Sequence, residues 1–248
     1  MTDEQRAATA RTALACLDLT SLNDDDQPAD IERLCERAMG PQGPTAAVCV
    51  WPRFVALART RLPAAVRVAA VANFPDGSTD LARALRDTQQ IVDAGGDEVD
   101  VVIPYREPAA APALLAAVRR ACSGLTLKVI LETGELQDEA LIRQACAIAL
   151  DAGADFLKTS TGKAPVSATP AAARLLLQAI VQGGHQNVGF KPAGGIRTVA
   201  DAALYIALTA EHLGSVTPQR FRIGASGLLN DIEAVLGGTA AQTASGTY

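Results

Sequence analysis

The chain has 248 residues, a formal net charge of −5, and 49% of its residues are apolar. This length is close to the ~250 residues of one (β/α)₈ barrel and leaves little room for a second domain. The acidic balance supplies no basic patch, which argues against nucleic acid as the main partner.

No stretch of the chain indicates a membrane or an export signal. Residues 1–11 are polar and charged, unlike a signal peptide, and no run approaches the ~18 consecutive apolar residues of a membrane span. The five cysteines are scattered, odd in number and never spaced as C-x-x-C, which disfavours a disulfide framework or a zinc site. We therefore expect a cytoplasmic protein that needs no metal or other cofactor.

Short apolar, β-branched runs alternate along the chain with longer stretches rich in alanine, leucine and arginine. The short runs predict strands at 17–22, 47–51, 67–72, 98–103, 127–132, 155–160, 188–191 and 221–224. The longer stretches predict helices at 3–14, 27–39, 53–62, 79–94, 110–122, 138–151, 170–183, 199–213 and 226–236. Thr169 before Pro170, and Thr198 three residues before Asp201, have the pattern of helix N-termini.

Strict alternation of strands and helices implies a parallel sheet with right-handed crossovers. Eight such units favour a closed (β/α)₈ barrel, a single domain over 1–248 with an extra N-terminal helix and a small polar tail at 237–248. An open doubly wound sheet is the alternative, although no G-x-G-x-x-G motif follows the first strand.

Lysine is scarce in this chain. There are 18 arginines but only four lysines, at 128, 158, 163 and 191, all in or beside predicted strands. Arginine replaces lysine wherever a permanent cation suffices, but not where a nitrogen must lose its proton and attack a carbonyl. The distribution therefore indicates amine chemistry.

Active-site groups of such a barrel come from the carboxyl ends of the strands. Polar residues at these ends are Asp18, Thr20, Cys49, Asp100, Glu132, Lys158, Ser160 and Lys191. Side chains alternate along a strand, so Asp100 points inward if Val99 and Val101 face the helices. By the same alternation Lys158 points inward, and we expect it to share a pocket with Lys191 and Asp100.

Two lysines in one pocket lower each other's pKa. Free lysine has a pKa near 10.4 and is neutral about once in ~2,500 at pH 7. A second ammonium ~5.5 Å away, at an effective dielectric near ~20, costs the charged form ~3 kcal/mol, or about two pKa units. A neutral Lys158 could form an imine with an aldehyde, with Asp100 moving protons through water. The alternative is that one lysine only pairs with Asp100 or Glu132, and such a structural pair is the better interpretation of Lys128.

The last two strand-to-helix connections are rich in glycine. Gly194 and Gly195 precede the seventh barrel helix, and Ser226 with Gly227 opens the eighth. Backbone N–H groups at helix N-termini bind anions, and this part of the barrel frequently binds phosphate. The two histidines, His185 and His212, lie outside any metal-ligand pattern and are expected at the surface.

Six segments resemble the 2-deoxyribose-5-phosphate aldolase family, in the family's order and over nearly the whole chain. They are LDLTSLN (17–23), DEVDVVIPYR (97–106), KVILETGEL (128–136), DFLKTSTGK (155–163), GFKPAGGIR (189–197) and FRIGAS (221–226). The resemblance implies a metal-independent class I aldolase that reversibly splits 2-deoxy-D-ribose 5-phosphate into acetaldehyde and D-glyceraldehyde 3-phosphate. It implies Lys158 as the imine-forming residue, Lys191 as the neighbour that lowers its pKa, and Asp100 as the proton-transfer partner.

The resemblance also implies a pocket around these three residues. Asp18, Thr20 and Cys49 would belong to the substrate pocket, and Lys163, Gly194, Gly195 and Ser226 would lie near the phosphate. Tyr248 would either assist proton transfer or lie outside the site. Gly227 stands where relatives carry a second serine, so we expect weaker binding of phosphate.

Two rival interpretations remain from the sequence. A phosphate-binding barrel isomerase would work without an imine, and a non-catalytic sensor would bind the sugar phosphate without turnover. A homodimer is common among such barrels, but the sequence reveals no interface.

Overall fold

A computed structural model describes residues 1–238 as eight parallel strands surrounded by helices. The strands are β1 (Leu17–Thr20), β2 (Ala47–Val50), β3 (Arg67–Ala72), β4 (Glu98–Val102), β5 (Thr126–Ile130), β6 (Phe156–Lys158), β7 (Gly189–Lys191) and β8 (Ile223–Ala225). From β1 to β7 each strand pairs with the next one in the sequence, and β8 pairs with β1. Two parallel bridges, Phe190 with Phe221 and Ala193 with Gly224, join β7 to β8 and close the ring.

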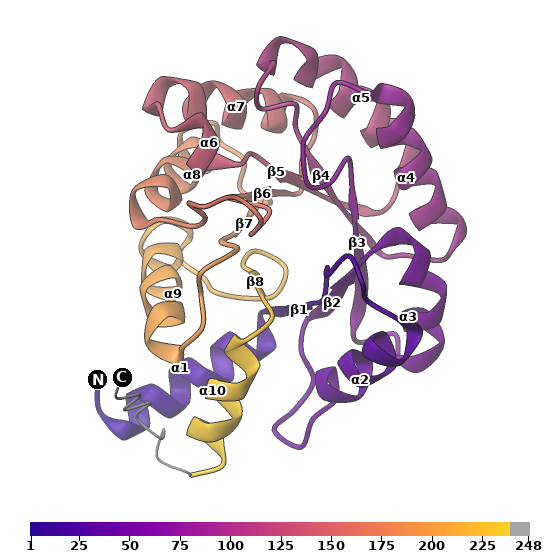
Figure 1. Cartoon of the computed structure of the whole chain (residues 1–248). Helices are drawn as coiled ribbons and strands as arrows, with labels where there is room; N and C mark the ends of the chain where they lie inside the picture. The colour runs from indigo at the N-terminus through magenta and orange to yellow at the C-terminus, as the bar shows by residue number, and fades with distance from the viewer. Residues whose placement is uncertain (239–248) are drawn as a thin grey trace, which may run out of the picture.

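The helices form an outer layer around this ring (Figure 1). They are α1 (Asp3–Ala15), α2 (Pro28–Ala38), α3 (Val55–Arg61), α4 (Leu81–Asp93), α5 (Ala111–Ala121), α6 (Thr133–Leu136), α7 (Glu139–Asp151), α8 (Pro170–Gln182), α9 (Val199–Leu213) and α10 (Leu228–Leu236). The predicted barrel with an extra N-terminal helix is confirmed, and α1 packs against α9 and α10. None of the helices within 1–238 is long and apolar enough to cross a membrane.

Local sequence explains where these helices begin. Thr169 accepts a hydrogen bond from the Ala172 N–H, and Pro170 follows at the first helical position of α8. Thr198 and Asp201 form the predicted capping box at the start of α9. Both predicted N-termini are confirmed.

Five strands, β1, β2, β4, β5 and β6, end one or two residues earlier than predicted. For β5 the reason lies in the backbone. β5 ends at Ile130, two residues before Glu132, whose φ of 53° and ψ of 58° lie in the left-handed region. The chain therefore leaves the sheet there and forms the short helix α6, which the sequence did not predict. β6 ends at Lys158, so Ser160 lies in the loop that follows.

The last part of the chain, residues 239–248, is outside the described residues. Most of the tail predicted at 237–248 falls there, and so does Tyr248, the candidate proton relay.

Candidate active site

Neighbouring strands place charged side chains at matching heights inside the barrel. Asp100 of β4 is the register partner of Lys128 of β5, and Lys158 of β6 is that of Lys191 of β7. All four side chains are buried. The three residues predicted to share one place therefore do lie together, while their catalytic roles stay a prediction.

The carboxylate of Asp100 holds three lysines at once. Its Oδ2 accepts hydrogen bonds from Lys158 Nζ and Lys191 Nζ, each at 2.8 Å. Its Oδ1 accepts a third from Lys128 Nζ, also at 2.8 Å. Because each amine lies 2.8 Å from the same Oδ2, the nitrogens of Lys158 and Lys191 are separated by no more than twice that distance.

A second layer of charges lies against this group. Arg222 of the loop before β8 donates to Asp18 Oδ1 at 2.7 Å and to Glu98 Oε1 at 2.8 Å. Lys128 forms an ion pair with Glu98, and Lys191 forms one with Asp18. The interpretation of Lys128 as a structural ion-pair partner is supported by these contacts, although it also contacts Asp100.

The charges of this buried cluster do not balance when every group is ionised. The cations are Lys128, Lys158, Lys191 and Arg222, and the anions are Asp18, Glu98 and Asp100. Four cations against three anions leave one excess positive charge, which is costly to bury. The cluster therefore favours the loss of one proton from a lysine.

Lys158 is the lysine whose surroundings favour that loss. Burial lowers the pKa of Lys158, and the Lys191 ammonium lowers it further, while Asp100 opposes the shift. Burial also disfavours the charged form of Lys191, but Asp100 and Asp18 outweigh burial and raise its pKa. Burial alone would raise the pKa of Asp100, but the three lysines hold it well below its usual range. Loss of a proton from Lys158, beside a charged Lys191, would balance the charges of the cluster.

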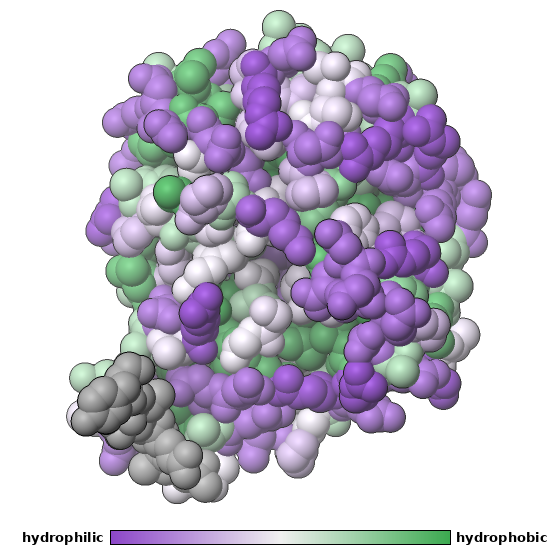
Figure 2. Space-filling view, in the orientation of Figure 1, coloured by the Kyte–Doolittle hydropathy of each residue, from purple (hydrophilic) through white to green (hydrophobic). Residues whose placement is uncertain are grey.

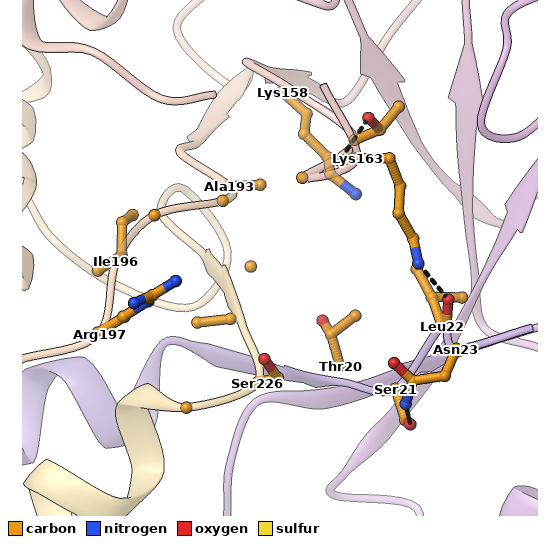
Figure 3. A pocket seen from close by; sticks show the side chains of 17 residues that line it. Thr20, Ser21, Leu22, Asn23, Lys158, Lys163, Ala193, Ile196, Arg197 and Ser226 are labelled. Carbon is orange, nitrogen blue, oxygen red and sulfur yellow. Dashed lines mark hydrogen bonds between the residues drawn. The ribbon is translucent and has the colours of Figure 1, made fainter. Parts of the chain in front are cut away.

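A cavity of about 530 Å³ lies at the carboxyl end of the strands. On the face seen in Figure 2, the surface is hollowed near the middle of the ring, and hydrophilic side chains gather around much of the hollow. Several residues predicted for the site line this cavity: Thr20, Lys158, Lys163, Gly194, Gly195, Ser226 and Gly227. The side chain of Lys158 points into the cavity, with Arg197 and Ser226 across from it (Figure 3).

The wall opposite Lys158 suits an anion. Gly194 and Gly195 have φ angles of 82° and 81°, which glycine adopts readily and other residues rarely do. The N–H groups of Gly195 and Gly227 have no acceptor within residues 1–238. Helices α9 and α10 begin just beyond these loops, so the positive ends of their dipoles face this wall.

Two residues predicted for the substrate pocket are buried and do not line the cavity. Asp18 is fully buried and serves as a partner of Lys191 and Arg222, without lining the cavity. Cys49 is fully buried as well, and burial raises the pKa of its thiol, with Asp100 adding to the shift. The Cys49 sulfur is therefore a poor nucleophile.

Some residues that line the cavity were not predicted from the sequence as site residues. Arg197, Ser21, Asn23 and Thr161 line the cavity, and each belongs to a segment that carried the family resemblance. Arg222 was missed although it lies within the predicted strand 221–224, because no local pattern shows that its side chain reaches Asp18 and Glu98.

Both histidines lie at the other end of the barrel. They line one cavity of about 400 Å³ in the connections that lead into β7 and β8, where Arg220 joins them. Each is partly exposed. Within residues 1–238, no group of three or more histidine, cysteine, aspartate or glutamate side chains is arranged to hold a metal ion.

Comparison with known proteins supplies the family. Residues 12–233 match the family model described as DeoC/LacD family aldolase. The chain is 50% identical over 252 residues to a deoxyribose-phosphate aldolase of Agrobacterium fabrum, a match that covers 97% of this chain and 96% of that protein.

Solved structures from Toxoplasma gondii and Aeropyrum pernix have the same fold. A crystal structure from Toxoplasma gondii ME49 has a TM-score of 0.87 at 24% identity, covering 97% of this chain and 98% of that one, a likeness that establishes the fold alone. A deoxyribose phosphate aldolase from Aeropyrum pernix, described as tetrameric, has a TM-score of 0.77 at 26% identity and covers 94% of this chain and 96% of that one.

Proposed function

This chain belongs to the DeoC/LacD aldolase family, and on that premise we propose that it is a deoxyribose-phosphate aldolase acting through a Schiff base on Lys158. The reaction is the reversible cleavage of 2-deoxy-D-ribose 5-phosphate to acetaldehyde and D-glyceraldehyde 3-phosphate. One observation carries the role of Lys158. Of the three lysines held by Asp100, it is the one that lines the cavity and the one whose pKa is lowered.

The first step is the attack of the neutral Lys158 Nζ on the aldehyde carbon of the open-chain sugar. The carbinolamine that forms loses water to give a protonated imine. A base then removes the proton of the C3 hydroxyl, the C2–C3 bond breaks, and its electron pair moves into the imine to give an enamine. Glyceraldehyde 3-phosphate leaves. Protonation of the enamine at C2 and hydrolysis of the imine release acetaldehyde and restore the amine.

Lys191 and Asp100 act on this chemistry from below the cavity. A charged Lys191 beside Lys158 favours the neutral amine before the reaction. Asp100 orients both amines through its Oδ2. Its low pKa makes a protonated Asp100 unfavourable, so we propose that it passes protons on through water and does not store them.

The phosphate end of the substrate is proposed to lie against the opposite wall. There the N–H groups of Gly195 and Gly227, the Ser226 hydroxyl and the Arg197 guanidinium border the cavity. Lys163 adds a positive charge from the β6–α8 connection. Their donors and positive charges match three phosphate oxygens better than they match a neutral sugar hydroxyl.

The cellular setting is also a proposal. All five cysteines are free and buried, which supports a reducing compartment such as the cytoplasm. The homodimer that is common among such barrels stays a prediction, which light scattering of the purified protein tests.

Turnover assays distinguish this function from its rivals. Purified protein given 2-deoxyribose 5-phosphate should release acetaldehyde and glyceraldehyde 3-phosphate in equal amounts, and Lys158→Ala should release neither. Conversion of the sugar phosphate without acetaldehyde would favour an isomerase. Tight binding without any conversion would favour a sensor.

A further inference from the structure

Glu132 has a backbone conformation that its residue type rarely adopts. With φ at 53° and ψ at 58° it lies in the left-handed region, where glycine and asparagine are the usual residues. It precedes α6, but its side chain makes no capping hydrogen bond to that helix. A glutamate in this conformation therefore indicates that its side chain has a function of its own.

That side chain is a buried carboxylate with an unusual set of partners. Glu132 is 1% exposed, and within residues 1–238 no cation forms an ion pair with it. Its Oε2 accepts hydrogen bonds from the Thr161 N–H at 3.2 Å and from the Thr161 hydroxyl. Burial raises the pKa of Glu132, and the hydrogen bonds from the Thr161 hydroxyl and N–H oppose this rise, so the carboxylate and Thr161 hold each other in place.

Thr161 in turn restricts the position of Lys163. Its Oγ1 accepts a hydrogen bond from the Lys163 N–H at 3.0 Å. Lys163 Nζ in turn donates to the Leu22 carbonyl oxygen at 2.7 Å, as Figure 3 shows. A continuous chain of hydrogen bonds thus runs from the end of β5, across residues 161–163, to the connection that follows β1.

Residues 161–163 form a thin wall of the main cavity. Thr161, Gly162 and Lys163 line that cavity together with Lys158. Thr161 and Lys163 also line a second cavity of about 290 Å³ behind them, whose wall includes Glu132 and Arg106. Because there is open space behind this wall, main-chain packing alone does not fix its position.

We propose that Glu132 is a positioning residue that holds the wall formed by residues 161–163 against the phosphate-bearing end of the substrate. The proposal rests on the proposed function for the identity of the substrate. Glu132 acts through Thr161 and Lys163, and it neither touches the reacting carbon nor forms the imine.

The diagnostic variant is Glu132→Gly. Glycine adopts the left-handed region readily, so this substitution removes the backbone strain. It also removes the hydrogen bonds with Thr161. The variant is expected to stay folded, because relief of the backbone offsets part of the lost hydrogen bonding, while the KM for 2-deoxyribose 5-phosphate rises about tenfold or more. The kcat is expected to change less than about threefold, because Lys158 and Asp100 are untouched.

Two further variants sharpen the test. Glu132→Gln keeps one acceptor oxygen for Thr161, so its KM should be close to that of the parent. Gln137→Gly serves as the matched control, because Gln137 also has a positive φ, 56°, at the other end of α6, but is exposed and lies outside the main cavity. Gln137→Gly should also remove the strain of a positive φ and should leave KM unchanged.

Direct binding separates this proposal from the function on which it rests. The Kd of the parent and of each variant for inorganic phosphate and for 2-deoxyribose 5-phosphate can be measured by calorimetry, whether or not turnover occurs. Weaker binding of both ligands by Glu132→Gly, with Gln137→Gly unchanged, supports the positioning role. An unchanged Kd and KM in folded Glu132→Gly would overturn the positioning role. So would an equal loss of affinity for 2-deoxyribose and for its 5-phosphate. Absence of turnover in the parent protein would refute the aldolase function and not the role of Glu132.

Discussion

Replacing Lys191 by methionine should raise the pKa of Lys158. The two amines share Asp100 Oδ2 at 2.8 Å each, so their nitrogens are at most about 5.6 Å apart. At an effective dielectric of ~20, the repulsion removed by the substitution is about 3 kcal/mol, or roughly two pKa units. Asp100 and Asp18 also lose a cation and become free to stabilise the Lys158 ammonium, which adds to the rise.

The assay is the pH dependence of imine trapping. Borohydride reduction of the enzyme–sugar imine is followed by mass spectrometry between pH 6 and pH 11, in the parent and in Lys191→Met. Because Lys158 reacts only as the neutral amine, the rate near pH 7 should fall about a hundredfold in the variant. The two rates should approach each other at high pH, as Lys158 becomes neutral in both proteins.

Lys191→Arg is the matched control, since it keeps the positive charge beside Asp100 and Asp18. Its profile should stay near that of the parent, apart from any loss due to the larger side chain. Loss of a buried ion-pair partner in Lys191→Met also lowers stability, so circular dichroism must establish that each variant is folded. A Lys191→Met profile with an unshifted midpoint and a uniformly lower rate would refute the electrostatic role of Lys191.

Three other predictions follow from the same cluster and cavity. Asp100→Asn leaves three buried amines without their shared carboxylate, so the free energy of unfolding in urea should fall by about 3–5 kcal/mol; a loss below about 1 kcal/mol would contradict the geometry. Gly227→Ser adds a hydroxyl where a Cβ would meet nothing within 4 Å, and one hydrogen bond of ~1 kcal/mol should lower the KM for the phosphorylated substrate about fivefold while leaving that for 2-deoxyribose unchanged. Burial would raise the pKa of Asp18 and of Asp100, but neighbouring cations outweigh it and hold both below the ordinary 3.8. The contribution of these carboxylates to the stability of the fold is therefore complete above pH 3.8 and is lost as the pH falls through the lowered pKa values. The urea midpoint should therefore drop steeply below about pH 4, and less steeply in Asp18→Asn; equal slopes would contradict this assignment.

Sequence patterns predicted the barrel well because its rules are local. Strand and helix periodicity, together with caps such as Thr198 and Asp201, do not depend on distant contacts. The inward direction of Asp100 and Lys158 followed from the two-residue alternation along a strand. These local rules also bring the lysines to neighbouring strands.

The parts that the sequence did not predict depend on contacts between distant residues. Arg222 lies 204 positions from Asp18 in the chain, and nothing near either residue indicates their hydrogen bond. Asp18 and Cys49 were expected in the pocket from the family resemblance, but both are fully buried and neither lines the cavity. The left-handed turn at Glu132 was missed because its residue type does not favour that conformation.

Formation of the covalent intermediate on Lys158 is the step on which the other proposed roles depend. Its most direct test is borohydride reduction of the protein with 2-deoxyribose 5-phosphate, followed by peptide mapping, beside Lys158→Ala and Lys163→Ala. The structure predicts a stable secondary amine on Lys158, absent from Lys158→Ala and retained in Lys163→Ala. An adduct on another lysine, or none in a folded protein that still binds the sugar phosphate, would contradict the account.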